Sequence, residues 1–121
     1  MSKRVLLIID DEVGLAKLTK LNLELTGEFQ VEVVYSGIEG VKKATEGVID
    51  LVITDFRMPG MDGKAVARAI KEVKPKCPIL LCTGDLEVFS EGSTEVDGVI
   101  NKPVDHKNLY GIINAVIAKQ A

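Results

Sequence analysis

Five short segments that are apolar or rich in β-branched residues divide this 121-residue chain, and they constrain its fold more than any other feature. They lie at residues 5–9, 31–35, 51–54, 79–82 and 98–100, and segments with helical spacing of apolar residues separate them. Short, continuous apolar runs are typical of strands that are buried on both faces. Because strand and helix alternate strictly, we expect an α/β fold with a five-stranded parallel sheet and five helices. The length suits one domain, over residues 1–121.

The expected helices carry signals for their starts and for the faces that they bury. Ser36 and Glu39 have the spacing of a capping box, and Asp62 and Asp105 are good N-caps. In the first helix, Leu18, Leu21 and Leu25 are spaced to face the sheet. The inward positions expected in the third and last helices are Val66, Ala69, Ile70, Val73, Leu109, Ile112, Ile113 and Val116. Residues 86–94 have a weaker pattern, for which we expect a short or mobile helix.

Composition excludes several classes of function. The formal net charge of −3 does not favour a nucleic-acid-binding surface, which is normally basic. No apolar run approaches the length of a membrane span, and residues 1–9 are too short an apolar start for a signal peptide. Cys77 and Cys82 do not form a close CxxC pair, and Cys82 lies in an apolar run as a buried thiol would. We therefore expect a reduced, cytoplasmic protein with no membrane or nucleic-acid partner.

Polar residues of particular kinds stand where the expected strands end. Asp10 and Asp11 follow the first strand, Asp55 follows the third, Thr83 follows the fourth and Lys102 follows the fifth. The carboxyl ends of parallel strands meet at one edge of the sheet, which is where such folds bind ligands. Three neighbouring carboxylates repel one another unless a cation is present. Oxygen ligands with no His or Cys favour Mg²⁺ over a transition metal.

Lys102 and Thr83 suit a phosphoryl group opposite this metal. Phosphoryl transfer depends on positioning and on neutralising the phosphoryl oxygens. A carboxylate can be the nucleophile and form an aspartyl-phosphate. Asp55 follows the strand expected at the centre of the edge, which makes it the candidate nucleophile, with Asp10 and Asp11 as the metal pair.

Each of these residues alone also has a purely structural explanation. Adjacent acids after a strand commonly mark a helix N-terminus, where the helix dipole favours them. Asp55 and Thr83 are of types common in turns and caps, and Lys102 before a proline is commonly a solvated turn residue. These separate explanations do not account for the recurrence of such residues at successive strand ends.

The chain resembles a receiver domain of the two-component response regulators over essentially its whole length. The matching pieces are IIDDE at 8–12, DFRMPGMDG at 55–63, CTG at 82–84 and NKP at 101–103. The resemblance implies a flavodoxin-like, doubly wound sheet of order 2-1-3-4-5. It also implies that Asp55 accepts a phosphoryl group from a sensor histidine kinase or a histidine phosphotransfer protein.

The resemblance assigns roles to the other site residues. It implies that Asp11, Asp55 and the backbone carbonyl of Arg57 hold Mg²⁺, with Asp10 acting through water. Lys102 would contact the phosphoryl group and Thr83 would move to meet it. A cis peptide bond between Lys102 and Pro103 is expected.

Departures from the family pattern generate further hypotheses. Receivers commonly carry Tyr or Phe where this chain has Val99, so we expect Thr83 to bond the phosphoryl group with a muted or different response in 86–100. Arg57 and Asp85 stand where the family tunes the phosphoryl lifetime, and they could pair across the mouth of the site. Asp97 is kept, but the charged pairs of the winged-helix transcription-factor dimers are missing, so we do not expect that dimer.

Three other functions remain to be weighed. A non-phosphorylated pseudo-receiver usually lacks an acid, the Thr or the Lys, and Val99 is the one feature that favours it. An Mg²⁺-dependent phosphatase with an Asp nucleophile needs a second acid where Arg57 stands. A flavin-binding protein needs a phosphate-cradling loop where Asp10 and Asp11 would repel the phosphate. The sequence does not separate a stand-alone adaptor from part of a longer regulator, and it does not identify the kinase or the output.

Overall fold

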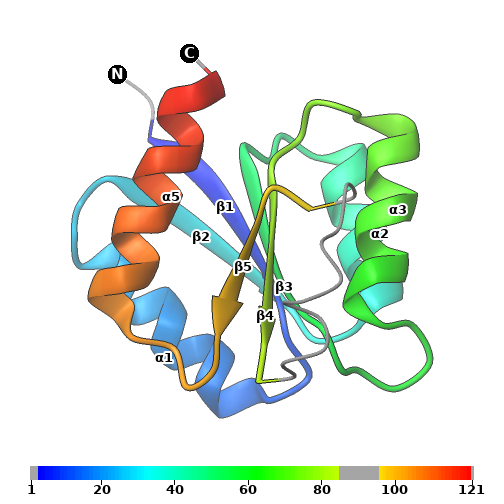
Figure 1. The fold of residues 1–121 in the computed structure, drawn as a ribbon, viewed down its shortest axis with the longest axis horizontal. Coiled ribbons are helices and arrows are strands. Elements are labelled where there is room, and N and C mark those ends of the chain that lie inside the picture. Colours follow the sequence, from blue (N-terminus) through cyan, green and yellow to red (C-terminus); the bar gives the residue numbers. More distant parts are fainter. Residues whose placement is uncertain (1–2, 85–95, 121) are drawn as a thin grey trace.

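A parallel β-sheet forms the centre of the molecule (Figure 1). The computed structural model describes residues 3–84 and 96–120. The strands are β1 (Arg4–Ile9), β2 (Phe29–Val34), β3 (Leu51–Asp55), β4 (Ile79–Thr83) and β5 (Gly98–Asn101). Their order is β2-β1-β3-β4-β5, and every neighbouring pair is parallel. The expected fold and strand order are therefore confirmed.

Helices cover both faces of the sheet, as Figure 1 shows. The described residues form α1 (Val13–Glu24), α2 (Gly37–Glu46), α3 (Gly63–Val73) and α5 (His106–Gln120). α1 and α5 lie on one face, and α2 and α3 lie on the other. The helix expected over 86–94 lies outside the described residues. No helix in the described ranges is long and apolar enough to cross a membrane.

Alternate residues of the strands fill two separate hydrophobic cores. Leu6 and Ile8 of β1 pack in the core under α1 and α5, while Leu7 and Ile9 pack in the core on the α2 and α3 side. Side chains of a strand point alternately to its two faces, so a central strand must be apolar at every position. This two-sided burial explains why the runs of β1, β3 and β4 are continuous rather than alternating.

The expected helix starts are confirmed where the structure resolves their caps. The Ser36 hydroxyl accepts a hydrogen bond from the Glu39 N–H at 3.2 Å, and the Asp62 carboxylate accepts one from the Ala65 N–H at 2.9 Å. The Asp105 carboxylate accepts one from the Lys107 N–H at 3.0 Å. These caps fix where α2, α3 and α5 begin, and α3 begins beside the end of β3.

The face that α1 turns to the sheet differs from the expected one. Leu18, Leu21 and Leu25 are between 47% and 75% exposed, whereas Ala16 and Leu23 are 1% exposed. Leucines occur on several sides of this helix, so the spacing of three of them fits an outer face as well as an inner one. The expected inward stripe of the first helix is therefore wrong.

α3 corrects a second expectation in the same way. Val66 and Ile70 are buried as expected, but Val73 is largely exposed and Ala67 is buried. Val73 is the last residue of the helix, where the chain leaves the sheet for the connection to β4.

The Asp97 carboxylate has its partners within the chain. It accepts hydrogen bonds from Lys71 Nζ at 2.9 Å and from the Ile79 N–H at 2.8 Å.

Two leucines of α1 provide a test of this packing. Replacing the buried Leu23 with Ala is expected to lower the free energy of unfolding by about 2–5 kcal/mol, because a cavity is left in the core. Replacing the exposed Leu21 with Ala is expected to change it by less than about 1 kcal/mol. Urea unfolding followed by circular dichroism measures both, and equal losses would contradict the observed orientation of α1.

Candidate functional site

The polar strand-end residues come together at one edge of the sheet. Asp55 is the last residue of β3, and Thr83 is the last residue of β4. Asp10 follows β1 directly, and Lys102 follows β5 directly. The parallel register places Asp55 beside Cys82 and Thr83 beside Asn101. Because the flanking sheet is apolar, each polar group lies at the point where its strand leaves the core.

Asp55 is held tightly at the centre of this edge. Only 7% of the Asp55 residue is exposed to solvent. Its Oδ1 atom accepts a hydrogen bond from the Phe56 N–H at 3.0 Å and lies 2.8 Å from Lys102 Nζ. The Thr54 hydroxyl donates to the Asp55 carbonyl at 3.0 Å. Both the side chain and the backbone of Asp55 are thus fixed by neighbouring groups.

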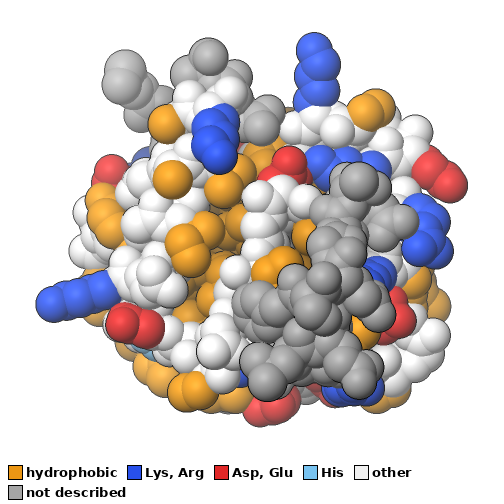
Figure 2. Space-filling model, in the orientation of Figure 1, with side chains coloured by type: hydrophobic (Ala, Val, Ile, Leu, Met, Phe, Trp, Pro, Cys, Tyr) orange, Lys and Arg blue, Asp and Glu red, His pale blue; other side chains and the backbone are white. Residues whose placement is uncertain are grey.

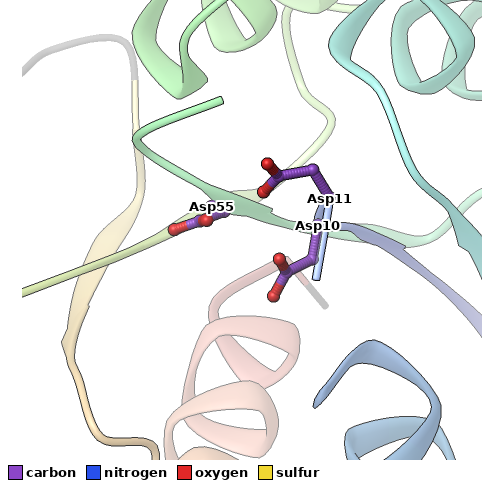
Figure 3. A group of neighbouring side chains, drawn as sticks. All are labelled: Asp10, Asp11 and Asp55. Atoms are coloured by element: carbon purple, nitrogen blue, oxygen red, sulfur yellow. The ribbon is translucent and has the colours of Figure 1, made fainter. Parts of the chain in front are cut away.

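Three carboxylates form an acidic cluster, and they extend to the same side of the strand ends (Figure 3). One carboxylate oxygen from each of Asp10, Asp11 and Asp55 lies within 4.8 Å of the others. The pKa of Asp10 is raised, mainly because burial penalises the charged carboxylate. The Asp10 carboxylate accepts a hydrogen bond from the Glu12 N–H at 2.9 Å, which lowers the pKa, whereas the negative charge of Asp55 raises it. The cluster therefore gathers negative charge in a partly desolvated place.

Lys102 is the cation that the structure places against this cluster. Burial alone would lower the pKa of its ammonium group, but the hydrogen bond from Lys102 to Asp55 and the charges of Asp55 and Asp10 raise it overall. Its backbone N–H donates to the Thr83 carbonyl at 3.0 Å, which ties the end of β4 to the residue after β5. The peptide bond that follows, between Lys102 and Pro103, is cis, as expected.

A cavity of about 420 Å³ opens beside Asp55. Its lining includes the expected site residues Asp55, Arg57, Thr83 and Lys102, together with Glu12 and Gly84. Thr83 is buried, and the Arg57 guanidinium lies 5.4 Å from the centre of the Phe56 ring. Asp85, the partner suggested for Arg57, lies outside the described residues. A cavity of this volume has room for a group as small as a phosphoryl group.

Sequence reasoning gave no role to Glu12 or Gly63, and the structure gives one to each. Glu12 lines the cavity, and its position after two acids was the only signal for it. Gly63 begins α3 so close to β3 that an added Cβ would lie 2.4 Å from the Asp55 carbonyl oxygen. Its N–H also donates to the Phe56 carbonyl at 2.7 Å. A side chain at position 63 would push directly on the backbone of Asp55.

The arrangement suits one kind of chemistry. The donor set is three carboxylates with no His or Cys among them, which fits a hard divalent cation such as Mg²⁺. Asp55 is a carboxylate nucleophile beside a cavity, and Lys102 can neutralise oxygens that approach it. The other two carboxylates of the cluster and Lys102 thus place opposite charges beside the Asp55 carboxylate.

Comparison with known proteins agrees with this chemistry. A family model for the response regulator receiver domain matches residues 6–114. Transcriptional regulatory protein GlrR of Escherichia coli is 36% identical over 120 residues, which are 96% of this chain and 27% of that protein. Response regulator ArlR of Staphylococcus aureus is 32% identical over 119 residues, which are 95% of this chain and 53% of that protein. The chain therefore spans between a quarter and about a half of these relatives.

Solved structures give the same result. A receiver domain protein of Methanospirillum hungatei superposes with a TM-score of 0.89 at 29% identity, over 98% of this chain and 97% of that one. The receiver domain of a sensor histidine kinase from Pseudomonas aeruginosa has a TM-score of 0.86 at 24% identity, over 97% of this chain and 99% of that one. The second was solved with a magnesium ion in its active-site cleft, and its likeness to this chain shows the fold.

The family model covers nearly the whole chain, and curated relatives exceed 30% identity. The polar groups that reasoning from the strand ends identified lie together at one edge of the sheet, around an acidic cluster. This chain belongs to the response regulator receiver domain family.

Proposed function

We propose that Asp55 accepts a phosphoryl group from a sensor histidine kinase or a histidine phosphotransfer protein, and that residues 1–121 are one receiver domain. The contact of 2.8 Å between Lys102 Nζ and Asp55 Oδ1, beside the acidic cluster, carries the proposal. A receiver of this kind is a signalling module rather than a metabolic enzyme. The chemistry that it performs is its own phosphorylation and the slow loss of its phosphoryl group.

The transfer step is a displacement at phosphorus. A carboxylate oxygen of Asp55 forms the new P–O bond, while the bond from phosphorus to the donor breaks and its electron pair leaves with the donor. With a phosphohistidine donor, the departing imidazole nitrogen keeps the electron pair of the broken P–N bond and takes up a proton from solvent. Lys102 meets the negative charge on the phosphoryl oxygens, and the N–H of Phe56 holds the carboxylate in place.

The acidic cluster provides the metal site of this proposal. Asp11, Asp55 and the backbone carbonyl of Arg57 would hold Mg²⁺, with Asp10 contributing through water. The observation that supports this set is the convergence of three carboxylate oxygens within 4.8 Å, beside the single cation Lys102 that forms an ion pair with Asp55 in the described part of the chain. When bound, Mg²⁺ supplies positive charge to the phosphoryl oxygens and offsets the repulsion among the carboxylates.

Thr83 and the surface beyond it provide the output. Thr83 lines the cavity at the end of β4, which supports a hydrogen bond from its hydroxyl to a phosphoryl oxygen and a movement of the chain that follows. The output partner, a domain or a separate protein, would recognise that change.

Both cysteines are free and buried, which is compatible with the reducing cytoplasm as the place of action.

Phosphorylation can be tested directly by intact mass spectrometry after incubation with acetyl phosphate and Mg²⁺. We expect the wild type to gain one phosphoryl group and Asp55→Asn to gain none, because the amide is not a nucleophile of this kind. Chelation of the metal with EDTA should abolish the labelling. Asp50→Asn is the matched control, because Asp50 accepts the Val5 N–H at the opposite edge of the sheet.

Each other outcome has a defined meaning. Labelling of Asp55→Asn would contradict the assignment of the nucleophile, and labelling without Mg²⁺ would contradict the metal site. No labelling of the wild type by either acetyl phosphate or a phosphorylated histidine-containing protein, with Mg²⁺ shown to bind, would favour the pseudo-receiver.

Lys102 offers a second test of the mechanism. Lys102→Ala is expected to slow labelling by about 100-fold, because one preorganised charge opposite the phosphoryl oxygens is lost. Mg²⁺ binding should persist, since all the carboxylates remain. Lys43→Ala is the control, because it removes an ion pair of 2.7 Å with Glu32 on the surface away from the site. An unchanged rate in Lys102→Ala would exclude a direct role for this ammonium group.

Thr83 and Val99 generate a third test, read by nuclear magnetic resonance with beryllium fluoride as the phosphoryl mimic. Thr83→Ser keeps a hydroxyl and should keep the spectral response, whereas Thr83→Val should lose the response while Asp55 is still labelled. Because Val99 replaces the usual aromatic residue, we expect the response of residues 86–100 to be small. A large rearrangement of this segment with the mimic bound would contradict the role given to Val99.

A further inference from the structure

α1 presents an apolar stripe to the outside of the molecule. Leu15, Leu18, Leu21 and Leu25 lie along it, and each is about half exposed or more. Hydrophobic side chains show along the lower left of the surface in Figure 2, where α1 lies in Figure 1. Contiguous exposed apolar surface on one element is typical of an interaction site rather than of a solvated helix. We therefore expect a binding partner to cover this face of α1.

The buried side of α1 defines the geometry of the exposed side. Ala16 and Leu23, which are seven residues apart, are the α1 residues packed in the core. Leu18 and Leu25 are also seven residues apart, and Leu21 lies between them at the spacing of a heptad seam. This seam lies opposite Ala16 and Leu23 on the helix. The outward face of α1 therefore has the pattern of a helix that pairs with another helix.

We propose that α1 pairs antiparallel with α1 of a second copy of this chain, about a two-fold axis near Lys20. In this pairing Leu18 of each copy packs against Leu21 of the other. Leu25 of each copy lies over Gly14 of the other, where the surface is open, because an added Cβ at Gly14 would meet no atom within 4 Å. The arrangement is self-complementary, as a two-fold interface must be.

Charges beside the seam favour a second copy in the antiparallel direction. Lys17 and Glu24 flank the seam on the same side, seven residues apart. An antiparallel pair brings Lys17 of each copy next to Glu24 of the other, which forms two symmetry-related ion pairs. In a parallel pair the residues on one side of the seam face those on the other side of the partner's seam, so Lys17 would lie next to Asn22 and no ion pair would form there. The Glu24 carboxylate is already oriented, because its Oε2 accepts the Val31 N–H at 3.0 Å.

The small area of this contact indicates a weak dimer. A single pair of helices of this length buries less than the roughly 800 Å² per partner of a stable interface. We therefore expect a reversible dimer with a dissociation constant on the order of 100 µM. α1 begins two residues after Asp11, so the second copy would stand beside the acidic cluster. The proposal does not rest on phosphorylation of Asp55.

Sedimentation of the full chain over a range of concentrations tests the pairing through a charge exchange. Lys17→Glu and Glu24→Lys should each weaken the dimer by about tenfold or more, because attraction becomes repulsion at two places. The double variant should restore it, and an equimolar mixture of the two single variants should form a mixed dimer. Thermal unfolding of each variant separates this effect from loss of the Val31 contact in Glu24→Lys.

A leucine variant and its control complete the test. Leu21→Gln should abolish the dimer, whereas Ile38→Gln should not, because Ile38 is an exposed apolar residue of α2. A wild type that stays monomeric to millimolar concentration would overturn the proposal, as would failure of the double variant to restore pairing. If Leu21→Gln instead blocks phosphorylation by a histidine-containing donor while labelling by acetyl phosphate is kept, the stripe belongs to the donor protein and the self-pairing is rejected.

Discussion

Burial of the sheet on both faces is the constraint on which the rest of this structure depends. β1, β3 and β4 have no face turned to water, so no polar side chain is tolerated along most of their length. The chain can place a charged group only where a strand leaves the core. Since all five strands are parallel, these exits lie at one edge, and Asp10, Asp55 and Lys102 are neighbours although up to 92 residues separate them in the sequence.

The same constraint gives the site its electrostatic character. Asp10 and Asp55 emerge from strands packed on both sides, so they keep only part of their hydration. Charges in such a place interact more strongly than in water, and an imbalance of three acids against Lys102 is a strong attraction for a divalent ion. The surrounding hydrogen bonds, from Phe56 to the carboxylate and from Thr54 to the carbonyl, hold Asp55 in place without neutralising it.

Sequence reasoning succeeded where burial was continuous and failed where a helix was apolar on more than one side. The strand exits could be placed because each buried run stops abruptly at a polar residue, as Ile53 and Thr54 stop at Asp55. The inner face of α1 could not, because leucines are spread around this helix and only packing shows that Leu23 is inside and Leu21 outside. Glu12 and Gly63 were missed for a different reason. Their roles depend on the path of the loops after β1 and β3, which local spacing does not encode.

The N-terminal end and the outward face of α1 have different physical environments, and a partner protein would meet both. The N-terminal end adjoins the acidic cluster, while the outward face is leucine-rich. A helix that is apolar on both its inner and outer faces has polar residues confined to its flanks, and Lys17 and Glu24 are among these. The chain thus carries charge where it sets the direction of a contact and apolar surface where it supplies the contact itself.

Gly63 shows how a residue without a side chain can control the position of Asp55. The carbonyl of Asp55 and the first turn of α3 are in contact only because position 63 has no Cβ, and the Gly63 N–H then closes the loop onto Phe56. A methyl group there would act as a wedge between the helix and the strand. In a scan of all substitutions, this position would stand with the acidic residues in its intolerance to change, although it takes no part in binding metal or phosphate. The site therefore depends on the absence of a side chain at position 63 as well as on its carboxylates.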